Sequence, residues 1–508
     1  MSGPRADTDI PQGFRASSSK KKRRLIEISL IVLAPFLLLV GGSLFSNYRS
    51  NQRLRDVIAA IEKDDPHWRL ADLEEHRNIP DEAENSAPRV LAVATRISGN
   101  WPVKGSPIED PDGNRLKLVN AAIERVAPYR LSDEMAEALK TELNGFGPAL
   151  ADARRLKDFP QGGTKIVWDD VPFLTLIPQV QETRKVSRLL QADALSRAQE
   201  GDLVAAFESI RANLNVARSL GDEPLLISML VRIAVDGITL SSVERTLSLG
   251  EAPAAPLEEL QRLLTQEEAE PLLYTGLRGE RAAYHDMIEK LRNGTVPRST
   301  LGTLGMPNMP MYLAPGWMFR TSQTLGLEAL NEGVKAAKGP PERLLETYQA
   351  IDQRAAKTPR WRAPFYFLFV PATNAASLAH VRSRTHLRCT IVMLAAERYR
   401  LDHGDWPKTL DALVPDYLES VPRDPFGSGP LRMLRRDDGL TIYSVSDDGN
   451  DDGARDLDVK NWRKPGNDLG TRLWDLKSRR QEMPVNRSAA VEPGAEPGTP
   501  LETPNEEH

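Results

Sequence analysis

The segment ERYRLDHGDWPKTLDALVPDYLESVPRDPFGSGPLRMLRRDDGLTIYSVSDDGNDDGARDLDVKNW, residues 397–462, decides the fold of the C-terminal part of this chain. It opens with the end of a long helix predicted over 374–401, which Gly404 and Pro407 bring to a stop. A short amphipathic helix at 410–418 follows, and then two stretches rich in β-forming residues. Antiparallel strands are predicted at 431–434 and 440–445, with a turn at 437–439. One long helix against a small antiparallel sheet makes this part a small α+β unit.

The order of the turns in this segment carries a family resemblance. Gly404-Asp405-Trp406-Pro407, then Asp424-Pro425-Phe426-Gly427, then Tyr443-Ser444 before an acid-rich loop resemble the globular head of the G-type major pseudopilins of type II secretion systems. The resemblance implies a pseudopilin-like head over residues 364–465, in which the long helix packs on the sheet. In that family the membrane helix runs directly into the head, whereas more than 300 residues intervene here.

The acid-rich loop at 447–458 holds six aspartates against one arginine, Arg455. Such a density of carboxylates needs solvent or a cation to relieve its repulsion, and hard oxygen ligands in a glycine-containing loop suit Ca²⁺. An EF-hand-type register uses Asp448, Asn450, Asp452 and Asp456, but its twelfth position is Val459. The pseudopilin resemblance instead implies the Val445 carbonyl, Asp448 and Asp458. The candidate metal ligands are therefore Val445, Asp448, Asn450, Asp452, Asp456 and Asp458, with an empty, solvated turn as the alternative.

Near the N-terminus, residues 25–45 form an apolar run of about 31 Å if helical, which is long enough to span a bilayer. The basic block at 20–24 precedes it, so the positive-inside rule places a cytoplasmic tail at 1–24 and the remainder in the periplasm, on a single-pass inner-membrane protein. A cleaved signal peptide, with small residues at 41–43, is the alternative. Leu25-Ile26-Glu27 resembles the start of prepilin membrane helices, but the processing glycine is replaced by Lys22, so no prepilin cleavage is expected.

Residues 46–360 are predicted to form an array of helical hairpins. In 202–219, Leu203, Phe207, Ile210, Leu214 and Ala217 repeat at helical spacing and define one buried face. The apolar stretch 223–243 contains Arg232 and Asp236, which cost too much in a bilayer centre, so it is predicted to be a buried soluble helix in which these two residues pair. Further predictions are a helix kinked or broken at Pro271, a Met-rich loop at 293–317 and a mostly disordered tail over 466–508.

Several motifs in residues 47–300 resemble those of large membrane-anchored helical proteins from planctomycete-type bacteria. The similar points are Asp65-Pro66-His67-Trp68-Arg69-Leu70, residues 79–85, residues 221–228 and Leu277-Arg278-Gly279-Glu280-Arg281. No activity is assigned to those relatives, so the resemblance implies an architecture only.

Catalytic motifs do not stand out. The histidines lack zinc-site spacing, Cys389 is the single cysteine and reads as a core residue, and the net charge of −5 argues against nucleic acid as a partner. The single charged cluster that serves as a catalytic candidate is Arg278-Gly279-Glu280-Arg281 with His285, because Arg281 and His285 lie one helical turn apart. Surface or inter-helix salt bridges are the alternative. The favoured function is a non-catalytic scaffold or binding protein of the cell envelope, with the membrane and other envelope proteins as partners and the oligomeric state left open. A membrane-tethered hydrolase and a Ca²⁺-responsive sensor are the alternatives.

Overall fold

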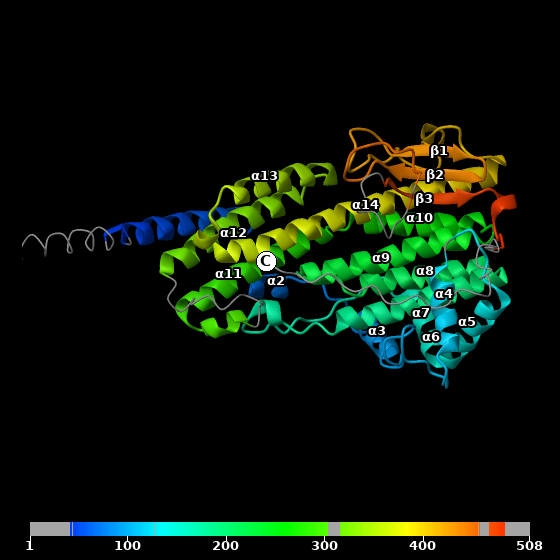
Figure 1. Cartoon of the computed structure of the whole chain (residues 1–508), viewed down its shortest axis with the longest axis horizontal. Coiled ribbons are helices and arrows are strands. Elements are labelled where there is room, and N and C mark those ends of the chain that lie inside the picture. The colour runs from blue at the N-terminus through cyan, green and yellow to red at the C-terminus, as the bar shows by residue number, and fades with distance from the viewer. Residues whose placement is uncertain are drawn as a thin grey trace, which may run out of the picture.

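The computed structural model describes residues 41–482 except 43, 126, 303–314, 456 and 458–466. Within this part the protein is mainly helical, with long helices lying side by side and a small antiparallel sheet against one end of them (Figure 1). The predicted class, helical with a small C-terminal α+β unit, is confirmed at this level. Most of the predicted membrane span at 25–45, the centre of the Met-rich loop at 303–314 and the tail from Met483 lie outside the described residues.

The helical part begins with a continuous helix over residues 44–64 and continues through thirteen numbered helices of the described chain. These are α2 (Leu70–Glu75), α3 (Ser86–Ala94), α4 (Asn114–Glu124), α5 (Asp133–Gly145), α6 (Gly147–Arg155), α7 (Gln179–Glu200), α8 (Leu203–Arg218), α9 (Leu226–Leu247), α10 (Ala254–Ala269), α11 (Leu272–Asn293), α12 (Gly316–Ala336), α13 (Leu344–Ala356) and α14 (Pro364–His403). Short 3-10 helices of the described chain include η2 (Pro172–Leu174), η6 (Arg360–Arg362), η7 (Leu410–Leu413) and η8 (Leu476–Ser478).

The turn between α7 and α8 illustrates how the hairpins form. Gly201 takes a positive φ of 90°, which favours glycine, and the Asp202 carboxylate accepts a hydrogen bond of 3.0 Å from the Ala205 amide to cap α8. The two helices then pack along their length. The predicted apolar face is confirmed, since all five of its members are buried: Leu203, Phe207, Ile210, Leu214 and Ala217.

Helix α9 lies inside the bundle, packed by α7, α8, α11 and α14. Of the described residues, this helix alone is long and apolar enough to cross a membrane, but most of its apolar stretch is buried in the protein. The predicted pairing of Arg232 with Asp236 is wrong. Arg232 instead pairs with Glu267 of α10 at 2.6 Å. Arg218 binds the same carboxylate at 2.8 Å, so the three side chains form one buried network. Burial without any hydrogen-bond partner in the described chain raises the pKa of Asp236 well above its usual range.

The predicted break at Pro271 is confirmed, because α10 ends at Ala269 and α11 begins at Leu272. Proline lacks the amide hydrogen that a continuous helix needs, so α10 ends before it and α11 starts as a separate helix.

Helix α14 is 40 residues long and belongs to both parts of the molecule. It begins ten residues before the predicted start at 374 and accommodates Pro371 in its interior, and it ends where Gly404 adopts a positive φ of 78°. Residues 387–396 of α14 share one core with α8 to α10 on one side and with the sheet on the other. The C-terminal unit is thus built onto the bundle through a common helix and a common core.

The sheet has the order β1-β2-β3 and is antiparallel throughout. Its strands are β1 (Arg432–Arg436), β2 (Gly439–Ser444) and β3 (Leu469–Trp474). The first two confirm the predicted hairpin, with Arg436 opposite Gly439 at the turn. The third strand lies beyond residue 465, where the head was predicted to end, so that boundary is wrong. Residues 467–482 are ordered because β3 pairs with β2 along its whole length and the buried Arg479 binds Glu397 of α14 at 2.9 Å.

Candidate functional site

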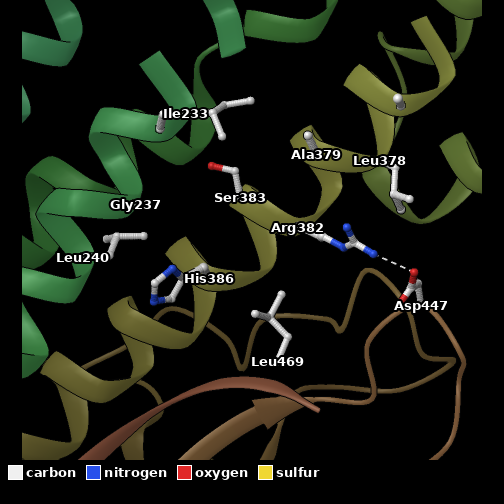
Figure 2. Close-up of a pocket in the computed structure, with 12 residues that line it drawn as sticks. Ile233, Gly237, Leu240, Leu378, Ala379, Arg382, Ser383, His386, Asp447 and Leu469 are labelled. Carbon is white, nitrogen blue, oxygen red and sulfur yellow. Dashed lines mark hydrogen bonds and ion pairs between the residues drawn. The ribbon is translucent and has the colours of Figure 1, made fainter. Parts of the chain in front are cut away.

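An open groove of about 740 Å³ runs over one face of α14, between α9 and the acid-rich loop (Figure 2). On α14 its lining residues recur at spacings of three and four, so they form one continuous helical stripe of about three turns along one wall of the groove. The lining residues are Ile233, Ala234, Gly237 and Leu240 of α9, Ala375, Leu378, Ala379, Arg382, Ser383 and His386 of α14, and Asp447 and Leu469.

The groove exists because the two helices present small side chains to it. Gly237 and Ala234 lie on α9, while Ala375, Ala379 and Ser383 follow one another at intervals of four on α14. A Cβ atom added to Gly237 would meet no atom within 4 Å. Glycine in the middle of a helix costs roughly 0.5–1 kcal/mol relative to alanine, yet no neighbouring atom requires it at this position. The small side chains therefore leave a space that the chain itself does not fill.

One side of the groove carries an ion pair. Figure 2 shows the Arg382 guanidinium reaching across to Asp447, and their separation is 2.6 Å. Asp447 belongs to the acid-rich loop, so this pair links α14 to that loop. The Asp447 side chain is 38% exposed whereas that of Arg382 is 10% exposed, which makes the carboxylate the partner that solvent or a ligand can replace. Arginine presents a planar fork of donors that suits a carboxylate or a phosphate.

His386 supplies the second polar group of the groove. Its Nε2 atom has no hydrogen-bond partner in the described part of the chain, and burial lowers the pKa of the imidazole to about 4. The ring is therefore neutral at physiological pH and offers one nitrogen as a donor or an acceptor. A mostly apolar groove with a guanidinium, a neutral imidazole and the Ser383 hydroxyl has the composition of a ligand-binding site.

The predicted calcium ligands are brought together only in part. Asp448 accepts a hydrogen bond of 2.9 Å from the Asn450 amide, as in a simple turn, while the Val445 amide donates to Asp424 at 3.1 Å. Asp456 and Asp458 lie outside the described residues. Within the described ranges, no group of three or more metal-ligating side chains is arranged to hold an ion.

Two aspartates that the sequence prediction did not select organise this region. Asp424 is fully buried and accepts hydrogen bonds from the Ser444 hydroxyl at 2.6 Å and from the Phe426 amide at 3.0 Å, so it fixes the end of β2. The Asp-Pro-Phe-Gly turn was the signal that could have identified it. Asp468 accepts from the Ala454 amide at 2.6 Å through one oxygen, while its other oxygen is buried without a partner in the described chain. Burial raises the pKa of Asp468, and the neighbouring carboxylates of the loop raise it further.

The catalytic candidate, Arg281 with His285, lies in a closed network on α11. Arg281 binds Asp65 at 2.5 Å, and His285 contacts Gln323 at 3.0 Å through one ring nitrogen and Glu289 at 2.9 Å through the other. Arg281 is 1% exposed and His285 4% exposed, so neither is open to a substrate. A carboxylate does join the pair, but the arrangement holds the segment around residue 65 against α11 and offers no reaction site.

Comparisons with protein families, with curated protein sequences and with solved structures find no match for this chain.

Proposed function

We propose that this chain is a non-catalytic, membrane-anchored binding protein of the cell envelope, and that the groove over α14 is its ligand site. The observation that carries the proposal is the combination of a 740 Å³ apolar groove with the Arg382–Asp447 pair at its side. Ligand sites in proteins typically occupy about 300–1,000 Å³ and combine apolar walls with a few polar groups that fix orientation. The buried state of Arg281 and His285 argues against the hydrolase alternative.

The lining points to an elongated apolar ligand that ends in a single anionic group. Eight of the twelve lining residues are aliphatic or glycine: Ile233, Ala234, Gly237, Leu240, Ala375, Leu378, Ala379 and Leu469. The anionic end of such a ligand replaces the Asp447 carboxylate on Arg382, while the chain lies between Gly237 and Ala379. A long-chain carboxylic acid has this chemistry. The proposed span at 25–45 holds the protein in the inner membrane, beside a source of acyl chains and beside other envelope proteins as partners.

Binding is tested with the full chain in lipid nanodiscs and a fluorescent polyene carboxylic acid as the probe. We expect saturable binding to the unmodified chain and retained binding in Gly237→Ala, because a Cβ at this position meets no atom within 4 Å. Gly237→Leu should lose binding, because its larger side chain extends from the same position on the groove wall. Arg382→Gln should weaken binding of the carboxylic acid more than binding of the corresponding alcohol. Equal binding by Gly237→Leu and the unmodified chain would overturn the proposal.

A calcium-binding role for the acid-rich loop is a second candidate, favoured by Asp468. Asp468 is only 4% exposed, and one of its carboxylate oxygens has no hydrogen-bond partner in the described chain. One buried carboxylate oxygen of Asp452 also has none. Two such oxygens in a loop of acid groups have the chemistry that a hard cation requires. This role also agrees with the proposed relationship of the C-terminal unit to pseudopilin heads. The thermal midpoint of the full chain should rise with Ca²⁺ relative to chelator, and Asp468→Asn should remove the difference. An identical midpoint in both conditions would eliminate the candidate.

A further inference from the structure

A basic and aromatic surface lies at one end of the molecule, in the segment KTPRWR over residues 357–362. Lys357, Arg360 and Arg362 are exposed, and none of the three has an ion-pair partner among the residues that the structure describes. Trp361 is 56% exposed, with the Arg362 guanidinium 5.3 Å from the centre of its ring. This segment therefore presents an exposed indole beside three basic side chains.

The contacts of the helix over residues 44–64 place this surface along the molecule. That helix runs parallel to α12, because Lys335 pairs with Asp64, Glu328 pairs with Arg53, and Arg320 donates hydrogen bonds to Asn47 and Ser50. Trp317 lies one turn before Arg320 on α12. It is therefore level with the first described turn of the helix over residues 44–64, beside the proposed membrane span. Figure 1 shows this helix, in blue, leaving the body at the end where α12 lies.

Trp317 and Trp361 are in contact, with ring centres 6.0 Å apart and planes at 86°. The KTPRWR segment is thus fixed at the same level as Trp317, next to the point where the chain enters the proposed span. Exposed apolar side chains on the adjoining turn continue the surface: Leu44, Phe45 and Tyr48.

We propose that Trp317, Trp361 and the three cations at 357–362 lie in the headgroup layer of the bilayer and bind anionic lipid headgroups. Indole rings favour this layer because they combine an apolar body with a polar N–H, and basic side chains are attracted to anionic lipids there. Two contacts with one membrane, the span and this surface, hold the helical bundle in a fixed orientation and keep the groove at a fixed distance from the bilayer. The inference rests on the proposed membrane anchoring.

The test uses the full chain in nanodiscs that contain phosphatidylglycerol. Trp361→Cys introduces a thiol that can be labelled with nitrobenzoxadiazole, whose ring replaces the indole, while the native Cys389 is buried and unreactive. Val204→Cys, exposed at the start of α8, is the matched control. We expect nitroxide lipids labelled at the headgroup to quench the probe at 361 and not at 204, and iodide in solution to quench only the probe at 204.

Neutralising Lys357, Arg360 and Arg362 to Gln should reduce the equilibrium constant for the lipid-contacting state by about fivefold per charge, and high salt should act in the same direction. Equal iodide quenching at 361 and 204 in incorporated chains would refute the proposal. Protection from iodide without nitroxide quenching would also refute it and would indicate a protein partner on this surface. If the chains do not insert into the bilayer but float with anionic vesicles and are released by salt, the proposed span would be refuted and the lipid-binding surface would be supported.

Discussion

Gly237 offers the most direct test of whether the groove over α14 is open. It lies in the middle of α9, and an added Cβ would meet no atom within 4 Å. Gly237→Ala should therefore stabilise the protein by roughly 0.5–1 kcal/mol, because alanine has less backbone entropy to lose on helix formation and encounters no obstruction. Spread over a chain of this size, that gain corresponds to a rise of about 1 °C in the thermal midpoint.

Gly279 on α11 is the matched control, since it is also a helical glycine but has no space. A Cβ there would lie 1.6 Å from the Pro224 carbonyl oxygen, so alanine must displace the backbone that precedes α9. Overpacking of this kind costs about 1–3 kcal/mol or more. The two glycine-to-alanine variants should therefore change stability in opposite directions, although the chemical change is the same.

The assay is thermal unfolding of the full chain in nanodiscs, followed by circular dichroism and repeated in urea at fixed temperature. Gly237→Leu extends the series, because it places a larger side chain in the groove and should remain at least as stable as the unmodified protein. A loss of stability in Gly237→Ala comparable to that in Gly279→Ala would refute the reasoning, since Gly237 itself would then be closely packed and the groove would leave no space for a ligand.

Two further predictions concern buried charge. Burial raises the pKa of Glu244 to about 7, although Thr471 donates a hydrogen bond of 2.9 Å to its carboxylate. The protonated form of Glu244 therefore contributes stability that is fully present below pH 4.5 and is lost as the pH rises through 7. Glu244→Gln should flatten the dependence of the thermal midpoint on pH between 4.5 and 7, and an unchanged slope would contradict this. Arg479→Ala should cost about 1.5–3 kcal/mol, because the buried Glu397 loses one of its two arginine partners and keeps Arg400 at 2.9 Å. Arg53→Ala removes an exposed pair worth at most about 1 kcal/mol. Urea unfolding compares the two variants, and equal losses would contradict the argument.

The features that were predictable from sequence are those set by local pattern. The apolar face of α8, the break at Pro271 and the β1–β2 hairpin each depend on residues within a few positions of one another. Helical periodicity, the chemistry of proline and the Asp-Gly turn are sufficient to determine them.

The features that were missed depend on residues far apart in the chain. Strand β3 is six residues long, contains Gly470, and is stabilised by pairing with β2 and by the bridge from Arg479 to α14, none of which a local pattern reveals. Asp236 was the predicted partner of Arg232 because the two residues are four positions apart in one helix. The carboxylate that binds Arg232 is instead that of Glu267 on the next helix. The groove likewise results from small residues on two helices about 140 positions apart, so its lining could not be assembled before the fold was known.

The common helix α14 changes how the two parts of the molecule relate. The sequence predicted a helical domain over 46–360 followed by a separate head over 364–465, whereas residues 387–396 of α14 belong to one core with both α10 and the sheet. One turn earlier, Arg382 joins the groove to the acid-rich loop through Asp447. A ligand that replaces Asp447 on Arg382 releases a carboxylate into the loop that holds Asp448 and Asp452, and a cation in that loop competes with Arg382 for Asp447. The proposed ligand site and the proposed cation site therefore share one charged residue, and linkage requires that each affect the affinity of the other equally.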